Sequence, residues 1–112
     1  MAERRWTLEA ARALLPDVRR RTERAFEEAQ QLLAERDDHP PESPGWRDAD
    51  GRVRVTVDRW AREMEALGLE VKGLWLVDFD SGAGFYCWRW PETELGFFHG
   101  YEEGFDGRVP IQ

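Results

Sequence analysis

The side chains best suited to chemistry gather in the last third of the chain. Residues 85–105 contain the single cysteine, Cys87, together with His99 and four glutamates. Thiolate, imidazole and carboxylate groups are the ligands that zinc and similar divalent metals take in proteins. Neither a Cys-x-x-Cys nor a His-x-x-x-His spacing accompanies them, so the signal rests on residue types alone. The sequence predicts a metal site with these ligands: Cys87, His99, Glu102 and Glu103.

Whether Cys87 and His99 share a sheet face depends on the turn between their strands. A four-residue turn at 91–94 places Tyr86 opposite His99 and turns Cys87 to the other face. A turn that effectively holds five residues places Cys87 opposite His99. In the purely structural alternative, Cys87 is a small buried hydrophobe and His99 is a hydrogen-bonded strand end.

Two arginines in the same region indicate a second kind of site. Arg89 and Arg108 are the only lysines or arginines after Lys72, and they lie among seven aspartates and glutamates. Each could pair with a carboxylate through two parallel hydrogen bonds, which would be a structural role. If both converged on one pocket, they would form a clamp for an anionic ligand. The predicted ligand-binding residues are Asp78, Arg89 and Arg108.

A Cys–His nucleophilic pair is a further alternative. It would need the His99 ring within hydrogen-bond reach of the Cys87 sulfur, a carboxylate such as Asp78 to orient the ring, and donors for an oxyanion. Such motifs do not transfer between families, so no catalytic residue is assigned. The leading hypothesis is a metal- or small-ligand-binding protein. A non-catalytic protein interaction module acting through its helices comes second, and an enzyme third.

A scaffold must position these residues, and the first two thirds of the chain supply it as helices. Thr7 is a good N-cap, and Pro16 then separates a short helix over 8–15 from a longer helix ending near Asp37. A single kinked helix also fits the pattern. In the longer helix an apolar stripe recurs in steps of three and four: Val18, Thr22, Ala25, Ala29 and Leu32.

A loop rich in proline and glycine follows, over residues 38–52, and leads to a second long helix. Trp46 in this loop has no obvious place within the chain, which makes it a candidate for an interface between chains. Asp50 fits as the N-cap of the second helix, and Gly68 is a natural stop. The two long helices are expected to form an antiparallel hairpin.

After Gly68 the pattern changes to short β-favouring runs at 74–79, 85–90 and 95–99. They predict a three-stranded antiparallel meander whose apolar face lies on the hairpin, followed by an ordered C-terminal loop. The expected fold class is α+β in a single domain over 1–112. Its helical hairpin spans 7–68, and its sheet and loop span 69–112.

Composition limits the partners and the compartment. The 112-residue chain carries a net charge of −7, which disfavours nucleic acid. Arg19, Arg20 and Arg21 are consecutive and therefore spread around a helix instead of forming one patch. No apolar run approaches the ~18 residues of a membrane span, and the single cysteine suits a reducing cytoplasm. A thin core and exposed aromatics predict a homodimer.

Three stretches carry a family resemblance: "TLEAARALLPDVR", "GLEVKGLWLVDFD" and "CWRWPETELGFFHGYEEGFDGRVPI". Together they resemble the bacterial family catalogued as domain of unknown function 2203, over nearly the whole chain except the 38–52 loop. Trp75 stands where that family usually has glycine, Pro91 where glycine is common, and Phe98 where tryptophan is usual. The resemblance implies no established activity. Its polar positions are Asp78, Cys87, His99 and Arg108.

Overall fold

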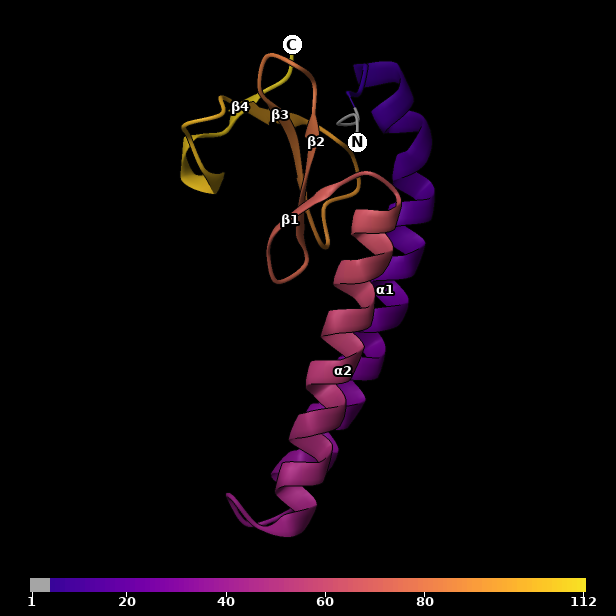
Figure 1. Ribbon diagram of the computed structural model, residues 1–112, viewed down its shortest axis with the longest axis vertical. Helices are drawn as coiled ribbons and strands as arrows, with labels where there is room; N and C mark the ends of the chain where they lie inside the picture. Colours follow the sequence, from indigo (N-terminus) through magenta and orange to yellow (C-terminus); the bar gives the residue numbers. More distant parts are fainter. Residues whose placement is uncertain (1–4) are drawn as a thin grey trace.

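Two long helices form an antiparallel hairpin in the computed structural model, which describes residues 5–112 (Figure 1). Helix α1 runs over Leu8–Asp37 and helix α2 over Pro44–Ala66. Thr7 caps α1 as predicted, because its hydroxyl accepts a hydrogen bond from the Ala10 N–H at 3.0 Å. The hairpin predicted from the sequence is therefore present.

Helix α1 continues through Pro16, so the prediction of a separate helix over 8–15 is wrong and the single-helix alternative is correct. Proline removes one helical hydrogen bond. Here Leu15 and Val18, on either side of it, are both buried in the core, while Pro16 itself is exposed. Tertiary packing therefore fixes the turns on both sides of the proline and outweighs the lost hydrogen bond.

Helix α2 begins seven residues earlier than predicted, at Pro44 instead of directly after Asp50. Ser43 is the N-cap and accepts from the Trp46 N–H at 3.4 Å, while Pro44 occupies the first turn, where its missing N–H costs nothing. Trp46 consequently lies on the helix, with the Arg36 guanidinium 5.0 Å from its ring centroid. The expectation that Trp46 has no place within the chain is wrong.

The seam between the helices is the predicted apolar stripe of α1, and all five of its residues are buried. Trp60 of α2 is buried against this stripe, and its indole N–H donates to the Thr22 hydroxyl at 2.8 Å. The α2 main chain ends near Gly68, whose φ of 93° is the left-handed value that glycine adopts without strain.

Five antiparallel strands, not three, follow the hairpin in the order β1-β2-β3-β4-β5. The two unpredicted strands are at the edges, where little side-chain burial is needed and the sequence pattern is weak. Strand β1 is largely exposed, and β5 has only two residues. The strands are β1 (Glu70–Gly73), β2 (Leu76–Asp80), β3 (Phe85–Arg89), β4 (Phe97–His99) and β5 (Val109–Pro110), with a 3-10 turn η1 (Phe105–Gly107) before the last.

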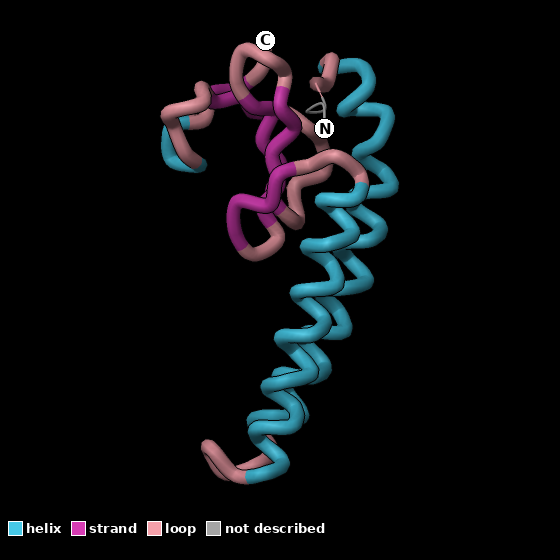
Figure 2. Tube along the Cα trace, viewed as in Figure 1, coloured by secondary structure: helices cyan, strands magenta, loops and turns pink. Residues whose placement is uncertain are grey.

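The sheet packs against one end of the hairpin and leaves the other end uncovered (Figure 1). The molecule measures 48 × 29 × 25 Å with a radius of gyration of 16.0 Å. A compact domain of this length would have a radius of gyration of about 13 Å. Both described ends of the chain lie at the sheet end, far from the 38–43 connection (Figure 2). Among the described residues, neither helix is long and apolar enough to cross a bilayer.

Strand pleating sorts the sheet residues onto two faces. Val77, Phe79 and Trp88 are fully buried and belong to the same core as the helices. Asp78 and Cys87 alternate with them along β2 and β3, so they point away from the helices. This outer face is where the candidate site lies.

Candidate metal centre

Strand register brings Asp78, Cys87 and His99 together on the outer face. Asp78 of β2 lies directly opposite Cys87 of β3. His99 ends β4 and lies opposite Phe85, two residues from Cys87 and therefore on the same face. Both registers considered from the sequence are wrong, because neither Tyr86 nor Cys87 is the partner of His99. The expectation that Cys87 and His99 can share a face is nevertheless met.

The connection between β3 and β4, residues 90–96, is also longer than either predicted turn. Leu95, expected to begin a strand, is only 1% exposed and fills the core between sheet and helices. Its carbonyl accepts hydrogen bonds from the Arg12 guanidinium at 3.2 and 3.4 Å. Strand β4 can therefore begin only at Phe97.

The three side chains form a tight and buried cluster. Asp78, Cys87 and His99 are 1%, 1% and 4% exposed. His99 Nε2 lies 2.9 Å from Asp78 Oδ2. One ligand atom from each of the three residues lies within 4.8 Å of the others. We call this cluster the triad. Its donor set of one sulfur, one nitrogen and one oxygen suits zinc and similar transition metals.

Asp78 is the residue of the triad whose hydrogen bonding is least complete. Burial raises the pKa of its carboxyl group, and the His99 ring, the Cys87 thiol and the Lys72 charge oppose this shift without cancelling it. Its Oδ1 atom is buried and has no hydrogen-bond partner of ordinary geometry within residues 5–112. A buried acceptor without a partner costs about 1–3 kcal/mol, so this oxygen requires an explanation.

The hydrogen bonds of His99 limit its protonation. Its Nδ1 lies 2.9 Å from the Gly100 carbonyl oxygen, which can only accept, so Nδ1 carries a proton. Nε2 also faces an oxygen, that of Asp78. A proton on either atom makes this contact a hydrogen bond between the ring and the carboxyl group. A metal ion could replace that proton, because a metal-binding histidine typically donates its other N–H to a backbone carbonyl.

Burial first, and then the charge and hydrogen bond of Asp78, raise the pKa of the Cys87 thiol to about 12. Arg108 opposes the shift, since its Nη1 approaches the sulfur to 4.0 Å. The sulfur is therefore a protonated thiol at neutral pH. This is the opposite of the low pKa that activates a catalytic cysteine.

Of the two predicted arginines, only Arg108 reaches the triad. Its guanidinium lies 4.0 Å from the ring centroids of both Phe97 and Phe105, and it donates to both carboxylate oxygens of Glu92 at 3.1 and 2.7 Å. Arg89 is exposed, and its guanidinium lies over the Phe105 ring, 5.2 Å from the ring centroid. The two arginines meet at one aromatic ring and do not line the cavity described next.

A cavity of about 330 Å³ adjoins the triad, beneath the C-terminal segment that contains η1. Glu103, one of the predicted ligands, lines it, and its Oε1 accepts from the Gly100 N–H at 3.0 Å. Glu102 is exposed and is not a lining residue. Sequence reasoning missed Lys72 and the aromatic walls, because β1 and the folding back of residues 100–108 leave no periodic pattern. The lining residues are Lys72, Leu76, Asp78, Phe85, Cys87, His99, Tyr101, Glu103, Gly104 and Phe105.

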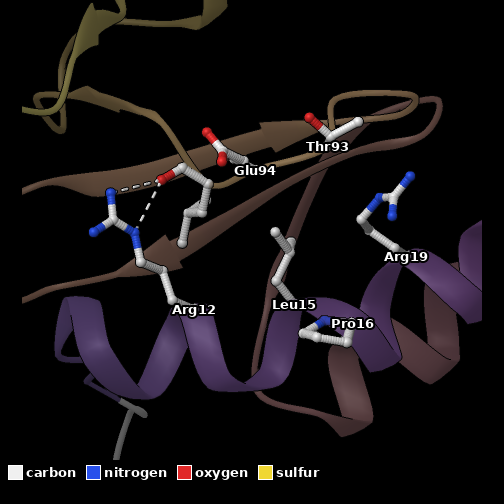
Figure 3. Close-up of a pocket in the computed structure, with 7 residues that line it drawn as sticks. Arg12, Leu15, Pro16, Arg19, Thr93 and Glu94 are labelled. Carbon is white, nitrogen blue, oxygen red and sulfur yellow. Dashed lines mark hydrogen bonds between the residues drawn. The ribbon is translucent and has the colours of Figure 1, made fainter.

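A larger hollow of about 540 Å³ lies between α1 and residues 93–95 (Figure 3). Its two arginines already donate to main-chain carbonyls, Arg12 to Leu95 and Arg19 to Glu92. Figure 3 shows Leu15 and Pro16 on the helix between the two arginines, with Thr93 and Glu94 on the facing segment. These arginines serve to hold the 92–95 segment against the helix. The candidate site is therefore the smaller cavity, where a buried polar atom lacks a partner.

The fold and the triad define a small α+β protein with a buried Asp–Cys–His cluster on the outer face of its sheet. The chain belongs to the family described as "Uncharacterized conserved protein (DUF2203)", whose model matches residues 4–111. The resemblance seen in the sequence is thereby confirmed. No curated protein and no solved structure matches the chain.

Proposed function

We propose that the protein binds a divalent transition metal, best matched by zinc, through Asp78, Cys87 and His99. One observation carries the proposal. The Oδ1 atom of Asp78 is buried beside a thiol and an imidazole, and within residues 5–112 it has no hydrogen-bond partner of ordinary geometry. A metal ion supplies the positive charge that this carboxylate lacks.

The distances in the triad fit a metal after small movements. Zinc bonds of ~2.0–2.3 Å in a tetrahedron place neighbouring ligand atoms about 3.3–3.6 Å apart. The 2.9 Å between His99 Nε2 and Asp78 Oδ2 must open by a few tenths of an ångström. The widest separation, up to 4.8 Å, must close by about 1 Å, which a side-chain adjustment can achieve. Three protein ligands leave a fourth position open toward the cavity.

Arg108 supports the metal as a neighbour of the thiolate. Its Nη1 lies 4.0 Å from the Cys87 sulfur, and Glu92 and two phenylalanine rings hold the guanidinium in place. Metal binding requires Cys87 to lose its proton. A fixed positive charge at this distance stabilises the resulting thiolate, and lysine could not reproduce the two-pronged contact with Glu92.

Zinc and cobalt binding to the purified protein tests the proposal. We expect one equivalent of metal, with cobalt giving a thiolate charge-transfer band in the near ultraviolet. Asp78→Asn, Cys87→Ser and His99→Gln should each weaken binding by about 10-fold to 100-fold or more, since each replaces a direct ligand. Glu102→Gln is the matched control and should leave affinity unchanged.

Two results would contradict the metal centre. One is zinc affinity that is the same in the wild type and in all three ligand variants. The other is a loss with Glu102→Gln as large as with Asp78→Asn. Circular dichroism of each variant separates loss of metal from loss of fold.

We also propose that two copies of the chain associate through the hairpin, which is the interaction role that ranks second. Val55 on α2 is 63% exposed and borders a groove between the helices that also contains Leu32. Two arginines and two glutamates also line the groove and pair with each other within the chain, Arg52 with Glu35 and Arg59 with Glu28, so a second copy related by a two-fold axis meets no unbalanced charge there. Sedimentation velocity at micromolar concentration should show a dimer that Val55→Arg dissociates. A monomer under these conditions contradicts this proposal and leaves the metal centre untouched.

A further inference from the structure

The cavity beside the triad has a single positive charge and apolar walls. Among the described residues that line it, Lys72 is the only lysine or arginine. Phe85 and Phe105, with Leu76, supply its apolar surface. The volume of about 330 Å³ is at the lower end of the range for small-molecule pockets. A ligand that fits here is small, partly apolar and negatively charged.

Lys72 is placed to meet such a ligand. Its Nζ lies 4.5 Å from the Phe85 ring centroid and 3.1 Å from a Glu70 carboxylate oxygen. The side chain is 38% exposed, and its four-carbon stem lets the ammonium group turn from the exposed Glu70 toward the cavity.

The charges of the site select the kind of anion. A divalent metal bound by ionised Asp78 and Cys87 has no net charge, so Lys72 supplies the remaining positive charge. Glu103 lines the same cavity and would repel a doubly charged anion such as phosphate. A carboxylate carries one charge, and its two oxygens can bridge two positive groups.

We propose that the cavity binds a small carboxylic acid with an apolar body, as its carboxylate. One carboxylate oxygen takes the open metal position, and the other accepts a hydrogen bond from Lys72 Nζ. The apolar body lies between Phe85 and Phe105. This inference rests on the proposed metal centre and adds the class of ligand that the centre receives.

Cobalt-loaded protein titrated with benzoate tests the inference, because the visible cobalt bands respond to a change of the fourth ligand. We expect benzoate to shift these bands saturably, and the neutral analogue benzamide and inorganic phosphate to bind at least about tenfold more weakly. Lys72→Met saturated with cobalt should bind benzoate about tenfold or more weakly than the cobalt-saturated wild type, since the substitution removes a charge-assisted hydrogen bond. Lys72→Arg retains the charge and should keep most of the benzoate affinity.

Each contrary result has a distinct meaning. Cobalt bands that do not respond to benzoate, or a benzoate affinity that is unchanged in Lys72→Met, overturn the carboxylate site and leave the metal centre standing. Phosphate that binds more tightly than benzoate overturns the choice of a carboxylate. A protein that gives no cobalt bands overturns the metal centre, and the ligand site with it.

Discussion

The uncovered end of the hairpin and the outer face of the sheet both carry polar side chains, but they satisfy them differently. On the hairpin, Arg52 and Glu35 form an ion pair of 3.3 Å with each side chain about half exposed. On the sheet, Asp78 is 1% exposed and one of its oxygens has no partner within the described chain. Water can hydrogen-bond to the exposed Arg52 and Glu35 side chains wherever their ion pair leaves a polar atom unpaired. Only protein groups or a ligand can do the same for the buried Asp78 oxygen.

This difference indicates where function should be sought. Exposed ion pairs contribute little and can be lost at small cost. A buried carboxyl group without full hydrogen bonding costs stability, so it persists where it serves another purpose. The hairpin is therefore the scaffold, and the triad is the candidate site. The following predictions test this contrast, beginning with the part of the hairpin that lies against the sheet.

Trp60→Ala should cause the largest loss of stability, about 3–5 kcal/mol, because it empties the centre of the hairpin–sheet core. Trp60 is 1% exposed, and its ring packs edge-on against Trp75 at a centroid distance of 5.0 Å. Urea unfolding followed by circular dichroism measures the effect. Trp46→Ala, at the uncovered end, is the matched control and should cost much less. Equal losses would show that the two ends of the hairpin are equally well packed.

Thr22→Val should cost about 1–3 kcal/mol, since it leaves the buried indole N–H of Trp60 without an acceptor. The hydroxyl and the indole nitrogen are 2.8 Å apart. Valine has nearly the same shape as threonine, so the loss reports the hydrogen bond and not the packing. Thr22→Ser keeps the acceptor and should lose only the contribution of one methyl group. A serine variant less stable than the valine variant would reverse this assignment.

The hairpin could be predicted from the sequence because its information is local. The stripe from Val18 to Leu32 repeats every three or four residues, and all of its members are buried as expected. The errors in the predicted hairpin concern the start of α2 and the effect of Pro16 on α1. The early start of α2 depends on the Ser43 cap, which the prolines of the loop concealed, and the continuity of α1 depends on burial around Pro16.

The sheet was harder to predict because long-range contacts decide it. Leu95 enters the core and is held by Arg12, a residue far away in sequence, and this contact sets the position of β4. Trp75 has a φ of 60°, a left-handed conformation that glycine adopts more easily than tryptophan. Packing of Trp75 against Trp60 offsets that strain. No short pattern in the sequence reveals either contact.

The sequence predicted the kinds of residue that form the candidate site, but only some of the individual residues. Cys87 and His99 do lie together, and Asp78, assigned from the sequence to a ligand site, is the carboxylate that joins them. The carboxylate of the cluster is Asp78 and not one of the two glutamates predicted as ligands, because Asp78 lies opposite Cys87 on the adjacent strand. Strand pairing is therefore the information that the sequence lacked.

Asp78→Asn should stabilise the metal-free protein at neutral pH by about 1 kcal/mol, because a buried carboxylate is replaced by a neutral amide of the same shape. Burial raises the folded-state pKa of Asp78 above the ordinary 3.8. The stability of the wild type relative to the variant is therefore greatest below pH 3.8 and falls as pH rises through the raised pKa. Urea unfolding in a metal chelator at several pH values measures this difference.

Asp80→Asn provides the control with the opposite sign. Burial alone would raise the pKa of Asp80, but hydrogen bonds from Tyr101 and the Gly82 N–H, together with Arg5, lower it overall. Its contribution to stability is present above pH 3.8 and is lost as pH falls through the lowered pKa. If both variants showed the same pH dependence, the distinction between an unsatisfied and a satisfied carboxylate on this strand would be wrong.

Arg52→Ala should have the smallest effect, below about 1 kcal/mol, because the ion pair with Glu35 is solvated and its side chains retain much of their freedom. High salt separates the remaining electrostatic part, since about 1 M salt reduces the screening length to ~3 Å. The wild type and the variant should then unfold at the same urea concentration. A difference that survives in high salt would mean that Arg52 acts through packing of its aliphatic stem on α2. The uncovered end of the hairpin would then be a second packed region. The triad alone would then differ from the hairpin in having a buried polar group without full hydrogen bonding.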